Sequence, residues 1–571
     1  MKNQEVARLL REIADYLEIE EVEYKPRAYR RAARSIESTA EPIEDVHARG
    51  ELEAVEGVGE SIASKVGEYL ETGELEYYEA LRADLPVDIE ALTSVQGVGP
   101  KTAKRLYREL GVSDLEDLEA AAEAGEIAAL EGFGERSERN ILEHVERARA
   151  GAERMLLGRA FPIADELASR LGDAEPFERV DVVGSFRRRR PTVGDLDVLA
   201  SASDATAAMD VVCEHDDVKE VLARGDTKTS VVVSGDLQVD VRIVDDAEYG
   251  SALVYFTGSK DHNIALRNRA IDRDWKLNEY GLFDVADVDE AGQRVGERIA
   301  SETEAAVYDA LDLPWIPPEL REDTGELAAA DAGELPSLVE LNDVRGDLQV
   351  HTTYSDGAGS VAEMAAAADE RGLEYVLVTD HGPNAPIPQR LDEDAFEEQV
   401  ADVEAANEGS DVTVLQGIEA EITDDGVTTP PAMLSACDVV VAALHGRPSD
   451  PTAALVDAIE DSAVDVLAHP SNRLLHERDP LDADWDAVMA AASDAGVAVE
   501  VNAQPERLDL AWRAIEEYRD VVEYVVSTDA HTTGELDYMH LGVAQLRRGW
   551  CEPADVLNTR SLADLQSWVA S

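Results

Sequence analysis

The sequence predicts a multidomain fold: helical domains come first, a mixed α/β region follows, and a β/α barrel ends the chain. Three glycine-containing segments, 56–66, 96–106 and 131–141, each place G-x-G before a helix-forming run. From about residue 178, alternating apolar residues replace the helical periodicity. Beyond residue 340, short apolar strands alternate with amphipathic helices. With 571 residues, the chain is too long for a single hydrophobic core.

Composition excludes several classes of protein. No apolar run is long enough to predict a membrane span, and the first residues, MKNQEVARLL, lack the pattern of a signal peptide. The three cysteines are too few and too scattered for a disulfide framework or a cysteine zinc site. We therefore expect a cytoplasmic protein that has no membrane partner.

The net charge is extreme, at −71, with 122 acidic residues against 51 basic ones. Such a charge is typical of disordered chains, but apolar periodicity runs through nearly the whole sequence and predicts folded domains. We interpret the charge as a carboxylate-covered surface, as found in organisms that keep molar salt in the cytosol. Net charge bears on solubility and solvent rather than on the fold.

The three glycine-containing segments read EGVGESIASKV, QGVGPKTAKRL and EGFGERSERNI. Glycines permit a tight turn between two helices, and the free N–H groups of the second helix can bind phosphate. A single copy fits a helix-ending glycine equally well, whereas three copies favour helix-hairpin-helix domains that bind the DNA backbone. The residues expected to contact DNA are Gly57, Gly59, Gly97, Gly99, Lys101, Gly132 and Gly134.

The α/β region carries acidic residues on two predicted strands. Asp195 and Asp197 are two residues apart, so both carboxylates lie on one face of a strand. In LQVDVRI, the apolar residues share one face and Asp240 points to the other. If these strands pair, three carboxylates converge, and they cannot all stay ionised without cations. Two Mg²⁺ or Mn²⁺ ions about 4 Å apart could activate an attacking hydroxyl and neutralise a leaving pyrophosphate.

The alternative interpretation of the aspartates is an exposed strand face in a very acidic protein. The neighbouring segment GSFRRRRPTVG favours the metal site. It follows a predicted strand and would place Ser185 at a turn beside four arginines. Hydroxyl and guanidinium groups are ligands of triphosphates. We therefore expect the arginines to hold nucleotide phosphates next to metals bound by the aspartates.

At these motifs the sequence resembles the family X DNA polymerases. GSFRRRRPTVGDLDVL, VDVR, YFTGSKDHN and LNEYGLF are similar, in the same order, to the palm and thumb of that family. YKPRAYRRAA with EGVGESIASK resembles its small N-terminal domain. The resemblance covers roughly residues 1–320 and implies a nucleotidyltransferase palm and thumb that use dNTPs on gapped or nicked DNA.

The resemblance also implies roles for single residues. Asp195, Asp197 and Asp240 would be the catalytic metal ligands, with Asp240 also the base for the primer hydroxyl. Ser185 and Arg188 would bind the triphosphate. Tyr255, Phe256 and Gly258 would line the sugar pocket, and Asn263 and Arg267 would contact the minor-groove side of the new base pair. Lys260 stands where DNA polymerase beta carries an acid.

Lys65 aligns with the lysine that forms a Schiff base with a 5′-deoxyribose phosphate in DNA polymerase beta. Ser61 replaces a neighbouring lysine of that enzyme. A lysine beside a helix-hairpin-helix is more often a simple phosphate contact. Both interpretations, a lyase nucleophile and a phosphate contact, stay open at this point.

Histidines mark the predicted strand ends of the last 230 or so residues, in the motifs GDLQVHTTYSDG, TDHG, ALHG, AHPSN and STDAH. Imidazoles and carboxylates at the C-terminal rim of a barrel predict a multi-metal site. One such histidine is usually a hydrogen-bonded core residue, but five at equivalent strand ends favour metal binding. His476 and His540 match no motif and are expected at the surface.

Residues 341–571 resemble the PHP family of metal-dependent phosphoesterases, which bacterial and archaeal family X polymerases commonly carry at this position. The resemblance implies Mn²⁺ or Zn²⁺ at the site and a 3′–5′ exonuclease activity, with abasic-site cleavage as a further one. The usual first motif, H-x-H, is here Gln349-Val-His351, and a glutamine offers only a neutral carbonyl oxygen. The implied metal ligands are His351, Asp356, His381, Glu419, His445, His469, Asp529 and His531.

These patterns divide the chain into six segments. They are a helical DNA-binding domain (1–80), a second helix-hairpin-helix domain (81–150), the palm (151–250), the thumb (251–320), an acidic linker (321–340) and the PHP domain (341–571). The leading hypothesis is a monomeric DNA polymerase that fills short gaps in base excision repair and carries a trimming nuclease.

Three other functions share some of these features. The first is a metal-dependent DNA nuclease whose polymerase half only positions DNA, and the full set of three aspartates argues against it. The second is a non-catalytic DNA-end binder, which two complete metal sites disfavour. The third is a template-independent nucleotidyltransferase, and the helix-hairpin-helices and the YFTGS segment favour a templated polymerase instead.

The acidic composition generates a prediction about salt. At 1 M salt the Debye length is about 3 Å, so self-repulsion of the surface carboxylates is largely screened. We expect the protein to keep its fold in molar KCl and to lose it in dilute buffer, as followed by circular dichroism during dialysis. Full stability in dilute buffer would contradict the halophilic interpretation.

Overall fold

The structure is a computed structural model that describes residues 154–570 except 216, 289–291, 388 and 425. Earlier in the chain it describes 6, 9–10, 13–14, 16–17, 25–38, 43–50, 52, 55, 58–72, 75, 77–78, 92, 95, 98, 100–130, 133–134, 138–139, 141–142 and 145. The chain separates into two compact units, of which one comprises Met1–Arg154, Val232–Gln238 and Asn263–Asp274 and the other the remaining residues. Each unit is described by itself.

The described N-terminal elements are helices, as the sequence predicts. Two of them begin directly after a G-x-G segment, α4 after Gly59 and α7 after residue 99. The helix α8 begins at a side-chain cap, since Asp114 accepts hydrogen bonds from the main-chain N–H groups of Glu116 and Asp117. The bounds are Lys25–Ser38 for α2, Ile43–Ala48 for α3, Glu60–Thr72 for α4, Pro100–Leu110 for α7 and Leu115–Glu123 for α8.

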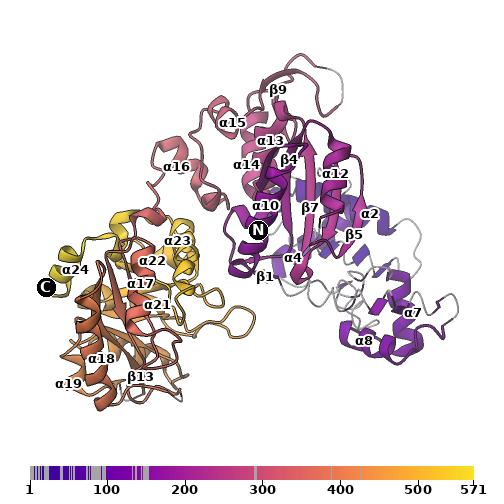
Figure 1. Cartoon of the computed structure of the whole chain (residues 1–571). Helices are drawn as coiled ribbons and strands as arrows, with labels where there is room; N and C mark the ends of the chain where they lie inside the picture. The colour runs from indigo at the N-terminus through magenta and orange to yellow at the C-terminus, as the bar shows by residue number, and fades with distance from the viewer. Residues whose placement is uncertain are drawn as a thin grey trace. The chain divides into compact units, whose positions relative to one another are not determined.

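A five-stranded sheet forms the centre of the α/β region, in the order β2-β4-β7-β6-β5. The strand β2 pairs with β4 antiparallel, and β4 pairs with β7 parallel. Figure 1 shows β4 and β7 side by side near the helix α12. The bounds are Phe177–Val182 for β2, Leu196–Ala202 for β4, Ala205–Cys213 for α12, Glu220–Arg224 for β5, Lys228–Val232 for β6 and Gln238–Val244 for β7.

Two helical elements precede or interrupt this sheet. The helix α10 (Leu157–Asp173) follows the short strand β1 (Met155–Leu156) in the chain and packs on β2. The strand β1 pairs with another short strand, β3 (Thr192–Val193). The one-turn helix α11 (Gly184–Arg187) connects β2 to β3 and holds the predicted nucleotide-binding turn.

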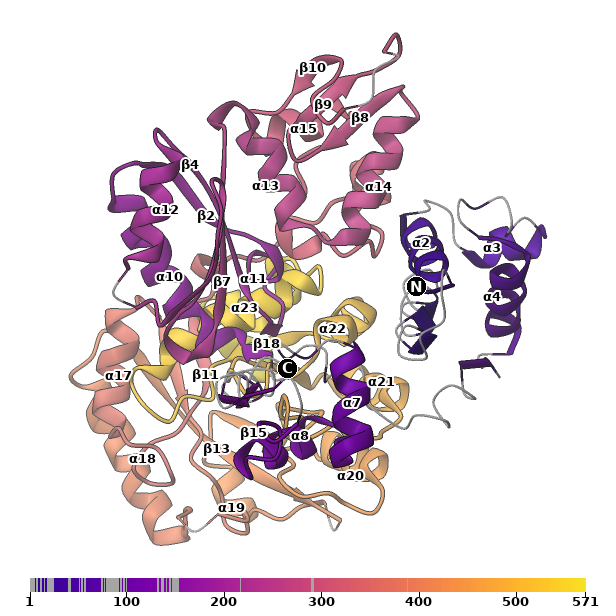
Figure 2. The same ribbon diagram turned by 90° about the vertical axis from the view of Figure 1, so that its right-hand side faces the viewer.

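The predicted thumb contains three helices and a small antiparallel sheet, β10-β9-β8. Figure 2 shows this sheet next to α13, α14 and α15. The bounds are Tyr249–Thr257 for α13, Lys260–Ile271 for α14, Trp275–Asn278 for β8, Gly281–Asp284 for β9, Glu297–Ala300 for β10 and Glu304–Ala310 for α15.

The segment predicted to be a linker, residues 321–340, contains packed side chains. It includes the helix α16 (Glu326–Ala332), and the side chains of Arg321 and Glu326 are fully buried. The Nδ1 atom of His262 lies 2.6 Å from Glu326 Oε1, and its Nε2 atom lies 2.8 Å from the hydroxyl of Tyr308. The beginning of this segment is therefore packed against the thumb.

Seven parallel strands form the C-terminal barrel, in the order β11-β12-β13-β15-β16-β17-β18. A parallel bridge between Val350 and Ala530 joins the first strand of this order to the chain just after the last. The strands are Gly346–Val350 (β11), Tyr375–Val378 (β12), Thr413–Thr423 (β13), Val439–Ala443 (β15), Val466–Ala468 (β16), Ala498–Asn502 (β17) and Tyr524–Ser527 (β18).

Helices surround these strands (Figure 1). Their bounds are Val361–Glu370 for α17, Glu393–Asn407 for α18, Pro431–Leu434 for α19, Pro451–Ile459 for α20, Trp485–Ala495 for α21, Trp512–Tyr518 for α22, Met539–Arg548 for α23 and Leu562–Val569 for α24. The interior of the barrel is apolar, and the side chains of Leu348, Leu377 and Val441 are almost wholly buried there. The predicted barrel fold is confirmed, and it brings the C-terminal ends of all seven strands to one rim.

Among the residues that the structure describes, no helix combines the length and the apolar character that crossing a bilayer requires.

Candidate active sites

The three predicted palm aspartates come together through strand pairing. In the parallel register of β4 and β7, Asp197 lies directly opposite Asp240. Burial alternates along β7, so its apolar residues face the core and Asp240 does not. Asp195 stands just before β4, close enough that its charge, like that of Asp240, raises the pKa of Asp197. The predicted convergence of the carboxylates is thus present.

The electrostatics of this cluster favour bound cations. Burial, together with the neighbouring charges of Asp195 and Asp240, raises the pKa of Asp197 to about 6. Lys228, from β6, opposes this effect, and its Nζ atom lies 2.6 Å from Asp240 Oδ2. Arg242 also lowers the pKa of Asp197. Carboxylates that raise one another's pKa nevertheless fit divalent cations, which prefer oxygen ligands.

Gly184 brings the predicted triphosphate-binding turn against this cluster. Its φ angle is +65°, and a Cβ atom there would lie 2.6 Å from Asp197 Oδ2. The main-chain N–H of Val183 donates to the carbonyl of Asp197 at 2.7 Å. Any larger residue at 184 would push the turn away, so glycine keeps Ser185 beside the carboxylates.

The four arginines of the turn have several partners, and two of them, Arg188 and Arg190, share Glu322. Arg187 makes a bidentate pair with Glu304, with both N–O distances at 2.8 Å. Although burial by itself would raise it, hydrogen bonding from Arg187 and the charge of Arg321 hold the pKa of Glu304 at about 2. Arg189 lies over the ring of Phe161, 4.6 Å from its centroid. The run therefore has structural roles, beyond the phosphate binding that the sequence predicts.

Arg188 lies closest to the predicted sugar pocket. It donates to the carbonyl of Thr257, and a Cβ atom at Gly258 would be 3.0 Å from its Nη1 atom. Tyr255 is 39% exposed at the end of α13, and its ring packs edge-on against Phe256 at 5.1 Å. One helical turn apart, Asn263 and Arg267 share a face of α14.

The barrel rim gathers all eight predicted histidine and carboxylate ligands. Glu419 is 1% exposed and lies at the centre of one group. Its carboxylate oxygens lie 2.7 Å from His381 Nδ1, 3.1 Å from His469 Nε2, 3.5 Å from His445 Nε2 and 3.7 Å from His351 Nε2. Asp529 Oδ1 lies 3.0 Å from His351 Nε2.

A second group forms around Asp356. Its Oδ1 atom lies 3.4 Å from the Nε2 atoms of His381 and His531, and 3.9 Å from His351 Nδ1. The side chains of His351, Asp356, His381 and His531 can converge on one ion, and those of His381, Glu419 and His445 on another. Burial opposes protonation of His381, but Glu419 and Asp356 raise its pKa to about 11.

Several buried polar atoms at the rim form no hydrogen bond of proper geometry among the described residues, although some of them lie within ion-pair distance of one another. They include both ring nitrogens of His351, His381 Nδ1 and Glu419 Oε2. A buried polar atom without a partner is costly, and imidazole nitrogens with carboxylate oxygens are the donor set of Zn²⁺ and Mn²⁺ sites. These residues therefore fit a metal centre.

Gln349 occupies the rim at the position of the missing histidine. Its side chain is 1% exposed, and its Nε2 atom donates to Glu419 Oε1 at 3.3 Å. Its carbonyl oxygen Oε1 is buried and makes no hydrogen bond among the described residues. The amide thus faces the same group as the histidines but offers a neutral oxygen in place of an imidazole nitrogen.

Several rim residues escaped the sequence analysis. Glu421 lies 2.6 Å from His445 Nδ1, and Glu500 accepts a hydrogen bond from the main-chain N–H of His469. Asn502 donates to Asp529 at 3.0 Å. Glu421 lies on β13, two residues after the predicted ligand Glu419, and Glu500 and Asn502 lie on β17. Their position on strands that end at the rim was the available signal. They orient the predicted ligands.

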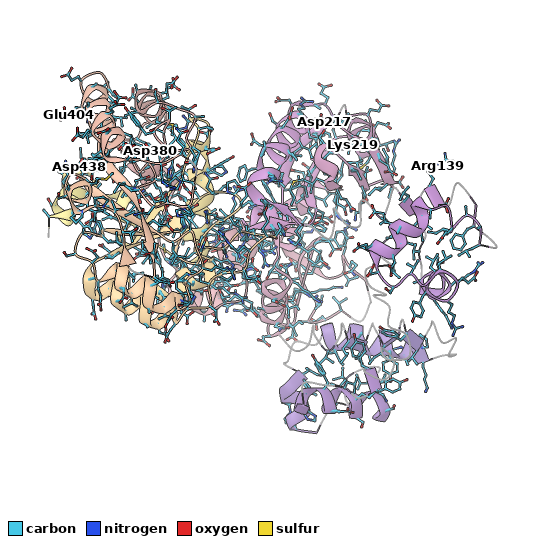
Figure 3. The ribbon with its side chains drawn as sticks, turned by 90° about the horizontal axis from the view of Figure 1, so that it is seen from below. Arg139, Asp217, Lys219, Asp380, Glu404 and Asp438 are labelled. Atoms are coloured by element: carbon cyan, nitrogen blue, oxygen red, sulfur yellow. The ribbon has the colours of Figure 1, made fainter. Side chains whose placement is uncertain are left out.

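Asp380 was also missed, although it stands inside the TDHG motif. It is fully buried and accepts hydrogen bonds from Thr352, Ser355 and Gln399. Figure 3 labels Asp380 among the side chains of the C-terminal domain, with Glu404 on the exposed side of α18. Asp380 therefore fastens the loop after β11 to the end of β12, where His351 and His381 lie.

One expectation about unmatched histidines is wrong. His476 is exposed as expected, but the ring of His540 packs edge-on against Phe161, with centroids 4.4 Å apart. Isolated histidines carry no pattern that separates a surface position from a packed one.

The predicted DNA-binding residues are described only in part. Gly57, Gly97, Gly99 and Gly132 lie outside the described residues, as does the side chain of Lys101. Gly59 and Gly134 are described, and no described atom lies within 4 Å of the position that a Cβ atom would take at either residue.

Lys65 lies on α4 next to an aromatic ring. Its ammonium donates to the main-chain carbonyl of Ser61 at 3.2 Å and to its hydroxyl at 3.1 Å, and lies 4.7 Å from the centroid of the Tyr77 ring. Burial lowers the pKa of Lys65, the charge of Lys25 lowers it further, and Glu68 opposes both.

Four family matches cover most of the chain. Residues 1–75 match a helix-hairpin-helix domain, and residues 89–147 match a SAM-like helix-hairpin-helix tandem. Residues 252–322 match the DNA polymerase beta thumb, and residues 347–559 match the PHP domain. The carboxylate cluster and the rim cluster therefore belong to a polymerase joined to a PHP phosphoesterase domain.

Individual proteins support the same assignment. The chain is 33% identical over its whole length to the DNA polymerase/3′-5′ exonuclease PolX of Bacillus subtilis, 99% of which it covers. It is 24% identical to DNA polymerase lambda of Rattus norvegicus over 56% of each chain. A probable phosphatase of Caldanaerobacter subterraneus is 31% identical over 27% of this chain and 61% of its own length. The chain belongs to the family X DNA polymerases that carry a C-terminal PHP domain.

The geometry of Gln349 generates a prediction. Replacing Gln349 with histidine would add an imidazole nitrogen near Glu419, which the amide Nε2 of Gln349 now faces. We expect Gln349→His to bind Mn²⁺ about tenfold or more tightly, since a single polar partner changes metal affinity by about 10–100-fold. Metal content after dialysis, measured by mass spectrometry, checks this, with Gln389→His as a matched control. Equal metal content in the variant and the parent would contradict it.

Proposed function

We propose that this protein is a DNA-directed DNA polymerase that fills short gaps during DNA repair, with a 3′–5′ exonuclease in its C-terminal domain. The observation that carries the proposal is the coexistence of two complete clusters on one chain. The first cluster contains Asp197 and Asp240, which lie opposite each other on paired strands beside the turn at Gly184. The second contains the histidines that surround Glu419. The full-length match to a protein named for both activities supports it.

In the polymerase half, each residue has a proposed task. Asp195, Asp197 and Asp240 hold Mg²⁺ or Mn²⁺, and Asp240 accepts the proton of the primer hydroxyl. Bound divalent cations supply charge neutralisation at the triphosphate and at the attacking oxygen. Ser185 and Arg188 bind the triphosphate, because the turn that carries them touches the carboxylates.

The remaining polymerase residues select the nucleotide. Tyr255, Phe256 and Gly258 lie at the end of α13 next to Arg188 and are proposed to line the sugar pocket. Asn263 and Arg267 are proposed to contact the new base pair from α14. The helix-hairpin-helix segments that contain Gly59 and Gly134 are proposed to bind phosphates of gapped or nicked DNA, and the enzyme is proposed to act as a monomer.

In the PHP domain, the eight rim ligands are proposed to hold Mn²⁺ or Zn²⁺. Bound ions supply a Lewis acid for the phosphodiester and lower the pKa of attacking water. Glu421, Glu500 and Asn502 keep the imidazoles and Asp529 in place. The same chemistry extends to cleavage at abasic sites, which is proposed as a second activity of this domain.

The two-site division predicts that single substitutions separate the activities. Asp195→Ala should lower gap-filling extension at least about a hundredfold, because it removes a metal ligand, and should leave exonuclease activity and DNA binding intact. His351→Ala should do the reverse. Both are measured in molar KCl with a labelled primer on a short-gapped duplex, with and without dNTPs.

His476→Ala, at an exposed position outside both clusters, serves as the control for each substitution. If either Asp195→Ala or His351→Ala abolishes both activities, the division into two sites is wrong. Primer shortening without any templated extension in the parent would favour a nuclease whose polymerase half only positions DNA.

A lyase activity is a second proposed function, and the environment of Lys65 favours it. Burial and Lys25 lower the pKa of Lys65, which increases the neutral amine that a Schiff base requires. The Tyr77 ring and Ser61 hold its ammonium nitrogen in place.

Borohydride trapping tests the lyase. Incubation with an incised abasic duplex and borohydride should yield a covalent adduct that Lys65→Ala loses, while Lys104→Ala, on α7 of the second helix-hairpin-helix, retains it. An adduct of equal yield in Lys65→Ala, or none in the parent, would leave Lys65 as a phosphate contact.

A further inference from the structure

Helix α23 of the PHP domain reaches the arginine turn of the palm through Arg548. This side chain is fully buried, with 0% of its surface exposed. Its guanidinium donates to the main-chain carbonyl of Arg188, and both Nη atoms lie 3.2 Å from Glu322 Oε1. A buried guanidinium is stable only with such partners, so these contacts hold Arg548 in place.

Glu322 is shared by three guanidinium groups. Besides Arg548, Arg188 donates from Nε to Oε1 at 3.1 Å, and Arg190 donates from Nη1 to Oε2 at 3.1 Å. The carboxylate is 8% exposed. Burial opposes ionisation of Glu322, but the charges of Arg548, Arg188 and Arg190 outweigh it and lower its pKa.

Arg188 therefore has two competing partners once a nucleotide arrives. Its guanidinium is held by Glu322 on one side and lies against Gly258 of the proposed sugar pocket on the other. To bind a triphosphate it must exchange the carboxylate for phosphate oxygens. Arg188 makes this exchange more readily when other guanidinium groups balance more of the negative charge of Glu322.

Further contacts fix α23 against the palm. The ring of His540 packs on the ring of Phe161, and the guanidinium of Arg189 also lies over the Phe161 ring. A Cβ atom at Gly158 of α10 would lie 2.9 Å from the side chain of Leu541. The first turn of the helix thus packs on the palm through His540 and Leu541, while Arg548 contacts the arginine turn from the last turn of the helix.

We propose that Arg548 of the PHP domain is a positioning residue for nucleotide binding in the palm: it balances Glu322 and thereby frees Arg188 to bind the triphosphate. This inference rests on the proposed role of Arg188 as a triphosphate ligand. Without Arg548, Glu322 would be balanced only by Arg188 and the half-exposed Arg190, and would compete more strongly with the triphosphate for Arg188.

The test is gap filling by the full-length Arg548→Gln variant in molar KCl. We expect the KM for dNTP to rise about tenfold, the size of a typical coupling between charged neighbours, with kcat almost unchanged. The Kd of dNTP for the complex with a dideoxy-terminated primer should rise by the same factor. Exonuclease activity should match the parent and reports a folded PHP domain.

Arg547→Gln is the matched control, because Arg547 lies on the same helix but pairs with Glu319 and the carbonyl of Val339. Its KM for dNTP should stay at the parent value. In the double variant Arg548→Gln/Glu322→Gln the competing carboxylate is gone, so the KM should return to the parent value or below. A merely structural role of Arg548 would not give this rescue.

The outcomes separate the inference from the proposed function. If Arg188→Ala leaves the Kd of dNTP unchanged, the proposed role of Arg188 is wrong. If Arg188→Ala raises it but Arg548→Gln does not, or if Arg547→Gln raises it equally, the inference is overturned. If Arg548→Gln does not fold, the single variant Glu322→Gln decides: tighter dNTP binding supports the inference, and unchanged or weaker binding overturns it.

Discussion

A charge removed from water needs an opposite charge beside it, and this constraint shapes every important part of the second unit. Glu419 lies under four imidazoles, Asp197 lies opposite Asp240 with Lys228 alongside, and Glu304 is held by Arg187 and Arg321. Where the balancing charge comes from the protein, it stabilises structure. Where carboxylates cluster, as among the palm aspartates, their mutual repulsion favours bound cations.

The same constraint explains where this acidic chain uses its few basic residues. The four arginines of the turn do not form a loose positive patch. Arg187 fastens the palm to the thumb, Arg188 and Arg190 share Glu322, and Arg189 covers Phe161. In molar salt an exposed ion pair is strongly screened, whereas a buried one is screened much less. Basic residues are therefore most effective where they are buried.

Family membership and local geometry answer different questions about this enzyme. The full-length likeness to a PolX protein and the thumb and PHP matches establish the class. The contacts show two features of this chain that membership of the class does not specify. Gln349 places an amide where an imidazole is usual, and Arg548 links the PHP helix α23 to the arginine turn of the palm. Both features concern single side chains.

The sequence by itself predicted the barrel and the strands that carry the palm aspartates, and its resemblance to the PHP family implied the eight rim ligands. Strand periodicity places Asp195, Asp197 and Asp240 on strand faces that point away from the core. In the barrel, parallel strands bring their C-terminal ends to one rim independently of the loop sequences. Such features follow from local pattern, so they could be predicted without coordinates.

Only the tertiary structure decided which partners the buried charges take. The packing of Glu326 against His262 turned an apparently acidic linker into part of the thumb, and Arg548 met Glu322 more than two hundred residues away. Tertiary packing likewise places Glu500 against the main-chain N–H of His469 and Glu421 against the ring of His445. A charge shows in the sequence, but its desolvation and its partner depend on how distant elements pack, and periodicity does not encode this.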